Sequence, residues 1–407
     1  MDSKDKRIEA FTNRQLFFTY MAQTSAAPIG LEMKTAEGIY ITDTNDKKYI
    51  DGIAGFSVNN IGHSHPEVVK AVQEQVAAYM HLIVYGEFIQ SPQASYAKLL
   101  IDHLPTHLNC VYFTNSGSEA VEGAMKLAKR VTNRHKIIAF KNAYHGSTQG
   151  ALSIMGDEYW RNAYRPLLPG ITHADYGNYS VIDLIDTHTA CIIMEVVQAE
   201  AGIKPANLDW LQAISNKCRE TGTLLVFDEI QSGFGRTGSL WAFKQYGIEP
   251  DILLLGKALG GGMPLGAFIS SNDNMKTLTD NPVLGHITTF GGHPVSCTAG
   301  KAALEVLLKN KWIDSIKDKE KLILKRLQHP LIKAVHYCGL WMALEFESFE
   351  INKAIIHNCI QKGLITDWFL FAPDCLRIAP PLSITELELH LLCDIIMESI
   401  KDFDTNK

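Results

Sequence analysis

The chain has little of what marks membrane, secreted or zinc-binding proteins. No uninterrupted apolar run approaches the length of a membrane span, and the start MDSKDKRIEAF lacks the apolar region of a signal peptide. The eight cysteines are scattered, with no C-x-x-C pair and no His/Cys spacing suggestive of zinc. We therefore expect a soluble cytoplasmic protein with reduced thiols and no metal site.

A strong charge of one sign is also missing. Lys and Arg number 38 against 44 Asp and Glu, the formal net charge is -6, and no long basic run appears. Neither nucleic acid nor an anionic membrane is therefore an expected partner. At 407 residues, of which 46% are hydrophobic, the chain is long enough for two domains or for one large domain with appendages.

Short β-rich runs alternate with helical patterns in the middle of the chain. Several of these runs are continuously apolar, which favours strands covered on both faces and hence a mainly parallel sheet. The runs are Cys110–Thr114, Lys136–Phe140, Ala190–Met194, Leu224–Phe227, Ile252–Leu255 and Gly266–Ile269. We predict an α/β fold with a large domain over residues 56–295. A smaller α+β domain is expected from both chain ends, residues 1–55 and 296–407.

A turn of small residues follows the first of these runs. Ser116 and Glu119 fit the S-x-x-E capping box of a helix that begins here. Gly117 and Ser118 place N–H groups and a hydroxyl at the positive end of that helix, which suits a phosphate. On this motif alone, a capped helix that binds nothing is an equal alternative.

An acidic pair, Asp228 and Glu229, follows the run Leu224–Phe227. Ligands of open α/β sheets bind at the carboxyl ends of the strands. We expect one carboxylate to hold a cationic group of a ligand and the other to make a structural ion pair. Taken alone, a helix-capping role for Asp228 is at least as good an interpretation.

Lys257 comes directly after an apolar run, and the glycines Gly260–Gly262 follow it. A lone lysine at such a place more often extends to the surface. A desolvated amine near other cations, in contrast, has the lowered pKa that a Schiff-base nucleophile needs. A phosphate turn, a carboxylate and an amine at neighbouring strand ends are together the three contacts that pyridoxal phosphate requires.

Further motifs extend along nearly the whole chain. They are Asp51-Gly-Ile-Ala-Gly55, Gly62-His-Ser-His-Pro66, Asn115-Ser-Gly-Ser-Glu-Ala120, Tyr144-His-Gly146, Phe227 to Gly238, Pro250 to Gly262, Thr289-Phe-Gly-Gly292 and Leu376 to Leu382. In this order they resemble the class III (ω-amino-acid type) aminotransferases, which are pyridoxal-phosphate enzymes of fold type I. The resemblance implies this fold, this cofactor and a homodimer with active sites shared across its interface.

The same resemblance implies a role for each cofactor-binding residue. Lys257 is the lysine that forms the aldimine and then moves a proton between the substrate and the cofactor. Asp228 pairs with the pyridine nitrogen, and Gln231 donates to the phenolic oxygen. The remaining contacts are Tyr144 stacked on the ring, Ile230 below it, and Ser116, Gly117 and Ser118 on the phosphate, joined by Thr289 from the other subunit.

The substrate residues implied by the resemblance are Arg377, Glu200, Phe56 and Ser147. Arg377 grips a carboxylate, because a guanidinium binds carboxylates bidentately. Glu200 pairs with this arginine and covers it while an ω-amine reacts; a plain structural salt bridge is the alternative. Ser147 stands where ornithine and acetylornithine members carry an arginine for a second carboxylate. A 2-oxoglutarate acceptor is thus in doubt, and the alternatives are pyruvate or recruitment of Arg161 or Arg165.

The predicted function is transfer of an amino group by a ping-pong mechanism. We expect the donor to be a diamino acid, an ω-amino acid or an amine, and the acceptor to be a 2-oxo acid. An aminomutase or a decarboxylase is the alternative with the same cofactor. A nicotinamide oxidoreductase is not supported, because the glycines after Lys257 precede Pro264 rather than a helical pattern. Retention of Lys257 and Asp228 argues against a protein that only binds.

Overall fold

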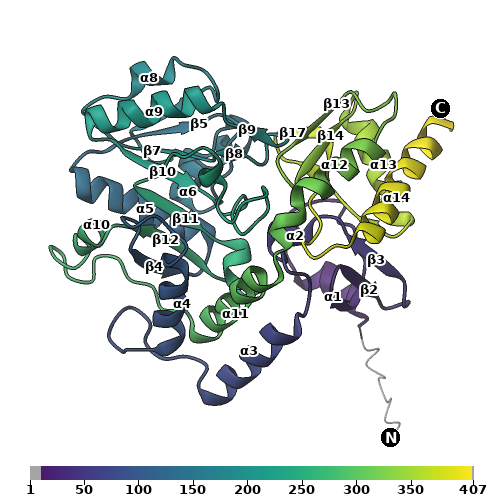
Figure 1. The fold of residues 1–407 in the computed structure, drawn as a ribbon, viewed down its shortest axis with the longest axis horizontal. Helices are drawn as coiled ribbons and strands as arrows, with labels where there is room; N and C mark the ends of the chain where they lie inside the picture. The colour runs from purple at the N-terminus through teal and green to yellow at the C-terminus, as the bar shows by residue number, and fades with distance from the viewer. Residues whose placement is uncertain (1–10, 406–407) are drawn as a thin grey trace, which may run out of the picture.

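A seven-stranded sheet forms the centre of the larger of two structural units (Figure 1). The computed structural model describes residues 11–405. The strand order is β4 (Cys110–Thr114), β12 (Gly266–Ser270), β11 (Ile252–Leu255), β10 (Leu224–Asp228), β7 (Thr189–Met194), β5 (Lys136–Phe140) and β6 (Ile171–Ala174). Only β12 runs antiparallel to its neighbours. The predicted α/β fold with a mainly parallel sheet is confirmed.

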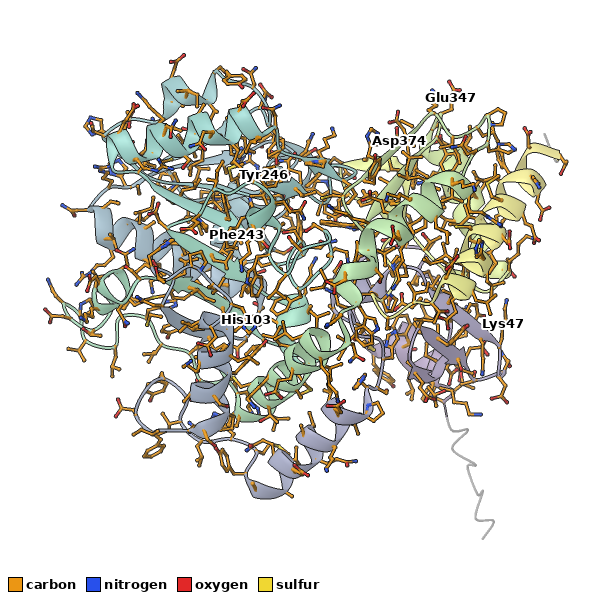
Figure 2. All side chains as sticks on the ribbon, viewed as in Figure 1. Lys47, His103, Phe243, Tyr246, Glu347 and Asp374 are labelled. Carbon is orange, nitrogen blue, oxygen red and sulfur yellow. The ribbon has the colours of Figure 1, made fainter. Side chains whose placement is uncertain are left out.

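Helices cover both faces of this sheet, and side chains fill the space between (Figure 2). On one face, α5 (Gly117–Thr132) buries an alanine-rich stripe that includes Ala120, Ala124 and Ala128. The other face carries α9 (Leu208–Thr221), which buries Trp210 and Leu211. Asn207 caps the start of α9, and Gly222 ends it with a left-handed φ of 67°.

Shorter elements complete this unit. The helices are α3 (Pro66–Ala78), α4 (Ser91–Ile101), α6 (Gln149–Ile154), α7 (Glu158–Arg161), α8 (Val181–Leu184), α10 (Asn272–Lys276) and α11 (Pro294–Asn310). The short 3-10 turns are η1 (Asn162–Tyr164), η2 (Ala242–Gln245) and η3 (Lys257–Gly260), and a two-stranded ribbon pairs β8 (Val197–Gln198) with β9 (Lys204–Pro205). Phe243, labelled in Figure 2, belongs to the core beneath them.

The smaller unit contains two sheets. The first has the order β1 (Met33–Glu37), β2 (Tyr40–Asp43), β3 (Lys48–Asp51) and β15 (Leu364–Ile365), so it joins the two ends of the chain. The second has the order β13 (Ala334–Tyr337), β14 (Met342–Glu345), β17 (Ala372–Ile378) and β16 (Trp368–Phe369). The helical elements are α1 (Asn13–Tyr20), α2 (Ala54–Ser57), η4 (Trp312–Ser315), α12 (Ile316–Arg326), α13 (Phe349–Gln361) and α14 (Glu386–Thr405).

The division between the units remains a prediction. The expected segment 1–55 begins with ten residues that lie outside the described ones. The expected boundary at 296 falls inside α11, which packs against α3, α4 and η3 of the large unit. We propose that the large unit continues to Asn310, the end of α11.

Buried hydrogen bonds of Arg236 join the two structural units. Its side chain is fully buried and donates to the carbonyl oxygens of Leu340 at 2.9 Å and Pro380 at 2.7 Å, and to Oδ1 of Asn60 at 2.6 Å. Burial lowers the pKa of the guanidinium to about 9. Three separate stretches of chain are therefore held by one cation.

Three further properties belong to the described residues. Between residues 11 and 405, no helix is long and apolar enough to cross a membrane. Within the same range, no group of three His, Cys, Asp or Glu side chains is placed to hold a metal ion. All eight cysteines are free thiols, and most of them are buried.

Candidate active site

Lys257 projects from the end of the fully buried strand β11 into the molecule. It begins η3 with a left-handed φ of 50°, which is uncommon for a residue with a side chain. Its Nζ donates to Oε1 of Gln231. Burial lowers the pKa of the Lys257 amine to about 8, although Glu200 and other carboxylates oppose this shift. The amine is thus available in its neutral, nucleophilic form near physiological pH.

Asp228 is the last residue of β10, the strand beside β11. Its Oδ1 accepts the backbone N–H of Ile230 at 2.9 Å, and its Oδ2 lies 2.7 Å from Nδ1 of His145. An ionised Asp228 makes this histidine nitrogen the donor. Sequence reasoning assigned no role to His145; its signal was only its place in the Tyr144-His-Gly146 motif.

The neighbouring carboxylate, Glu229, points elsewhere. It accepts the backbone N–H groups of Ala242 at 2.7 Å and Phe243 at 2.6 Å, at the start of η2. Burial raises its pKa to about 7. The expected structural ion pair is therefore wrong: backbone donors, not a cation, satisfy this carboxylate.

The turn of small residues opens α5 as the sequence indicates. Ser116 accepts the N–H of Glu119 at 3.2 Å, which is one half of the predicted capping box. The other half differs, because the Glu119 carboxylate accepts the N–H of Asn115 rather than that of Ser116. A Cβ on Gly117 would lie 2.9 Å from Cδ1 of Ile230, so a side chain at this position would crowd the turn.

These strand ends and turns surround one cavity of about 200 Å³. Eight of the predicted site residues line it: Ser116, Gly117, Ser118, Tyr144, Asp228, Ile230, Gln231 and Lys257. The other lining residues are His145, Gly146 and Glu195. Gly146 has a φ of 127°, and a Cβ there would lie 2.1 Å from Oγ of Ser118, so only glycine fits between the two loops.

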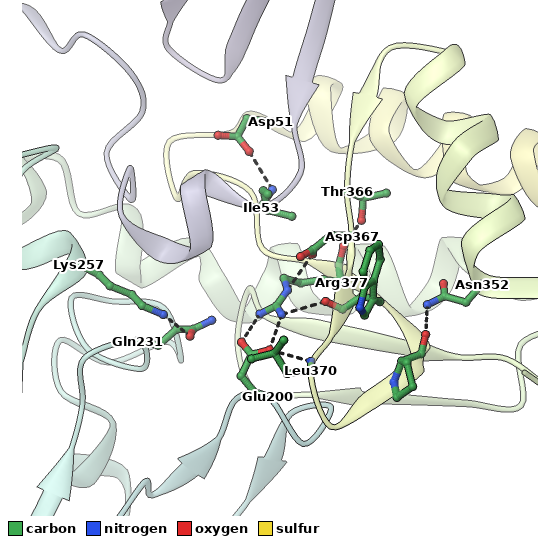
Figure 3. A network of polar contacts seen from close by, with 12 residues as sticks. Asp51, Ile53, Glu200, Gln231, Lys257, Asn352, Thr366, Asp367, Leu370 and Arg377 are labelled. Carbon is green, nitrogen blue, oxygen red and sulfur yellow. Dashed lines mark hydrogen bonds and ion pairs between the residues drawn. The ribbon is translucent and has the colours of Figure 1, made fainter. Parts of the chain in front are cut away.

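The predicted substrate residues Arg377 and Glu200 form a buried ion pair beside this cavity (Figure 3). The guanidinium of Arg377, from β17, donates to both carboxylate oxygens of Glu200 at 3.0 and 2.8 Å. Burial alone would raise the pKa of Glu200, but Arg377 and its hydrogen bonds hold it below the usual value. Burial alone would lower the pKa of Arg377, but its carboxylate partners raise it above the usual value.

A second carboxylate, which sequence reasoning missed, holds the same guanidinium from the other side. Asp367 accepts from Nε of Arg377 at 2.9 Å. The arginine also lies over two aromatic rings, with its Cζ 4.0 Å from the ring centre of Phe369 and 5.2 Å from that of Phe56. Burial raises the pKa of Asp367 to about 6. The sequence carries no motif for this contact.

The remaining predicted residues lie outside the cavity lining. Ser147 is exposed, with its Oγ 3.2 Å from the hydroxyl of Tyr144. Thr289 lies in an exposed loop, where its carbonyl oxygen is 2.9 Å from Nε2 of His81. The single chain therefore does not bring Thr289 to the cofactor cavity.

Neither arginine considered for recruitment lies at the site. Arg161 is buried against Ser153 and His173, and it lines a different cavity of about 600 Å³. Arg165 pairs with Glu158 at 2.7 Å, and Arg161 contacts the same carboxylate. Both guanidinium groups are committed elsewhere.

Comparison with known proteins identifies the family. A family model described as aminotransferase class-III matches residues 20–400. The chain belongs to the class-III aminotransferases. Its sequence is similar to that of the acetylornithine aminotransferase of Methanopyrus kandleri, with 38% identity over 93% of this chain and 96% of that one. It is 34% identical to the acetylornithine aminotransferase of Bacillus anthracis, over 92% and 94% of the two chains.

Solved structures agree with this membership. The ornithine aminotransferase of Toxoplasma gondii superposes with a TM-score of 0.88 at 28% identity, over 96% of this chain and 93% of that one. An adenosylmethionine-8-amino-7-oxononanoate aminotransferase from Methanocaldococcus jannaschii gives 0.88 at 28% identity, over 96% and 98%. This class-III aminotransferase is a transaminase whose cofactor is pyridoxal phosphate, and the aminomutase and decarboxylase alternatives are not favoured.

The cavity fits that cofactor by its donors and by its shape. Nε2 of Gln231 and Nε2 of His145 are buried without a partner among the described residues, so polar atoms face the cavity unsatisfied. The N-terminus of α5 supplies a positive end for a phosphate. Gly117 and Gly146 leave the space that side chains would occupy.

The pKa of Lys257 predicts how uptake of the cofactor depends on pH. Only the neutral amine attacks an aldehyde, so the uptake rate of the cofactor-free protein should rise about tenfold per pH unit below pH 8 and level off above it. Stopped-flow absorption of the bound cofactor measures this rate. Lys319 is a matched control, because burial also lowers its pKa to about 8. Lys319→Arg should keep the profile; a profile without a bend near pH 8 in the wild type contradicts the assignment.

Proposed function

We propose that this aminotransferase moves an ω-amino group from a diamino acid, an ω-amino acid or an amine to a 2-oxo acid with one carboxylate. The observation that carries the proposal is the place of Arg377: a guanidinium beside the cavity of Lys257, covered by the carboxylate of Glu200. The names of the acetylornithine and ornithine relatives support the ω-amino donor.

Eight residues of the cavity have a proposed task. Bound pyridoxal phosphate supplies an electron sink for the carbon that carries the amino group. The amine of Lys257 would hold the cofactor covalently and would take and return the substrate proton. Asp228 would hold a positive charge on the ring nitrogen, and Gln231 would donate its free Nε2 to the phenolic oxygen. Tyr144 and Ile230 would contact the ring of the cofactor, and Ser116, Gly117 and Ser118 would bind its phosphate.

A screen of half-reactions tests the function. Purified protein should show the visible absorption of bound cofactor, and an amino donor should bleach it. Candidate donors are acetylornithine, ornithine, 4-aminobutyrate, β-alanine, lysine and simple amines. Lys257→Ala should lose both the covalent attachment and turnover. If no amino compound bleaches the absorption of the wild type, transamination of these substrates is wrong.

Glu200 is proposed to switch the charge that faces the substrate. While Glu200 is paired with Arg377, its negative charge offsets the charge of the guanidinium, and the pocket accepts an uncharged or amine-terminated substrate chain. When Glu200 moves away, the guanidinium is free for a substrate α-carboxylate. Asp367 accepts from Nε of Arg377 at 2.9 Å, so a second carboxylate is placed to remain as counterion of the buried arginine when Glu200 moves.

Replacement of Arg377 separates the switch from a plain structural salt bridge. Arg377→Ala should lower kcat/KM for α-amino and α-keto acids about 100-fold more than for ω-amines, because only the former need the bidentate contact. Half-reaction kinetics with paired substrates measure the two losses, and circular dichroism checks folding. Arg377→Lys is the control, because lysine keeps the positive charge but lacks the paired N–H donors of a guanidinium. Equal losses for both substrate classes would contradict the switch.

The number of cationic side chains near the cavity bears on which 2-oxo acid accepts the amino group. Apart from Lys257, none of the described lining residues is Lys or Arg, so Arg377 is the guanidinium beside it. The exposed segments 80–90 and 277–293 contain no Lys or Arg that could cross to another subunit. One cation binds one carboxylate well, which favours a monocarboxylate such as pyruvate over 2-oxoglutarate.

Ser147→Arg should restore binding of a second carboxylate. A hydrogen-bonded charged contact is worth about 1.5–3 kcal/mol, so kcat/KM for 2-oxoglutarate relative to pyruvate should rise about 10- to 100-fold. Acceptor half-reactions measure this ratio. Ser147→Gln has comparable bulk without the charge and should leave it unchanged. A wild-type enzyme that prefers 2-oxoglutarate would overturn the proposed acceptor.

We also propose that the enzyme is a homodimer with shared active sites. Large apolar side chains are exposed in two segments that border one hollow. They are Met80, Leu82, Ile83, Phe88 and Ile89 in the first segment, and Val283, Leu284, Ile287 and Phe290 in the second. Monomers rarely expose such patches. Thr289 lies in this surface, which fits its expected contact with the phosphate of the other subunit.

The proposed location is the cytoplasm. Eight free cysteines fit a reducing compartment, because thiols in oxidising compartments tend to pair.

A further inference from the structure

Glu195 is a buried carboxyl group beside the one proposed to hold the cofactor's ring nitrogen. The strands β7 and β10 run parallel, with Met194 opposite Phe227. The next residue of each strand end is therefore Glu195 on one and Asp228 on the other. Both side chains line the same cavity, and both residues are buried, with 6% and 4% of their surface exposed.

The two carboxyl groups are hydrogen-bonded very differently. Asp228 contacts the N–H of Ile230 at 2.9 Å and Nδ1 of His145 at 2.7 Å, one donor for each oxygen. Oε1 of Glu195 accepts only the N–H of Ala199, at 3.3 Å. Its Oε2 is buried and has no partner among the described residues. Glu195 therefore has fewer hydrogen-bond contacts than Asp228 to stabilise an ionised carboxylate.

Other charged groups face Glu195 from several elements. Glu200 follows shortly after β8, and Lys257 faces Glu195 from η3. The hydroxyl of Tyr176, from the loop after β6, donates to the backbone carbonyl of Glu195 at 3.0 Å and leaves the carboxyl free. Glu195 thus lies near the carboxyl groups of Glu200 and Asp228 and near the amine of Lys257, whose pKa burial lowers to about 8. Adjacent buried carboxyls of this kind do not both ionise.

We propose that Glu195 keeps its proton at neutral pH and acts as a positioning residue that leaves Asp228 as the single negative charge at these two strand ends. The inference rests on the proposed function, because Asp228 has its role only with the cofactor bound. Burial, followed by the charge of Asp228, raises the pKa of Glu195 well above its usual value. A neutral Glu195 concentrates the negative potential at one carboxylate. Loss of its proton would add a second charge that also stabilises the protonated amine of Lys257.

Infrared spectroscopy of the holoenzyme tests the proton directly. At about pH 8, above the pKa of about 7 of Glu229, the wild type should show a carbonyl band of a protonated carboxyl group that shifts in D₂O. Glu195→Gln should remove this band. Glu229→Gln is the matched control, a buried carboxyl in the same region, and should leave it. A wild type without the band, or a band that survives in Glu195→Gln, overturns the proposal.

Unfolding measurements give a second readout on the full chain. A carboxyl that is protonated in the folded state and ionised when unfolded releases a proton on unfolding, so stability falls as pH rises above the unfolded pKa of about 4.3. The ratio of the wild-type unfolding constant to that of Glu195→Gln should rise up to tenfold per pH unit above about pH 5. A ratio of unfolding constants that does not change with pH overturns the proposal.

These readouts separate the proposal from the proposed function. The infrared band does not depend on turnover, so a protein that fails the half-reaction screen can still show a protonated Glu195. If Glu195→Gln does not fold, glutamate labelled with carbon-13 identifies the band in the wild type and in Glu229→Gln. A band at pH 8 that does not move on labelling then overturns the proposal.

Discussion

The ion pair between Arg377 and Glu200 sets the relation between the two structural units. The guanidinium comes from the small unit and the carboxylate from the large one, and the pair is almost fully buried. Two backbone N–H groups of the small unit, those of Leu370 and Phe371, also donate to Glu200, at 3.0 Å each. Removal of Arg377 would leave the buried carboxylate of Glu200 without its guanidinium partner, at a cost of about 3–5 kcal/mol. The contact that covers the substrate cation is thus also a contact that joins the units.

Four carboxyl groups near the strand ends show how surroundings decide the charge of one functional group. The guanidinium of Arg377 binds both oxygens of Glu200 and holds its pKa below the usual value, whereas the two oxygens of Asp228 contact the N–H of Ile230 and Nδ1 of His145. Glu229 is held by two backbone N–H groups away from the cavity. Glu195 has the poorest set of donors. The sheet supplies these differences, because it fixes which backbone groups each side chain meets.

The sequence predicts the large sheet well for a physical reason. Strands buried on both faces are continuously apolar, so β7, β10, β11 and β12 stand out as short apolar runs. The edge strand β6 does not, because Thr172 and His173 interrupt its apolar pattern. The sequence places most of helix α11 in the small unit, and no local pattern in the sequence predicts its packing against α3 and α4.

The candidate site was predictable where residues carry their own chemistry. Lys257, Asp228 and the turn at Ser116 lie at strand ends, and the fold brings them to one cavity. Contacts that depend on register or on distant loops could not be predicted. Asp367 meets Arg377 only through the pairing of β16 with β17, and Glu195 meets Asp228 only through the register of β7 with β10. The commitment of Arg161 to Glu158 and His173 likewise needs the fold.

The pairing of β15 with β3 has a consequence for biosynthesis. Leu364 lies beside Ile50, so the first sheet of the small unit cannot be completed until most of the chain has left the ribosome. All strands of the large sheet lie between Cys110 and Ser270 and can assemble earlier. During that interval β3 has an unpaired edge, the kind of surface on which chains aggregate. All strands of the large sheet are therefore synthesised before β15, the last strand of the first small sheet.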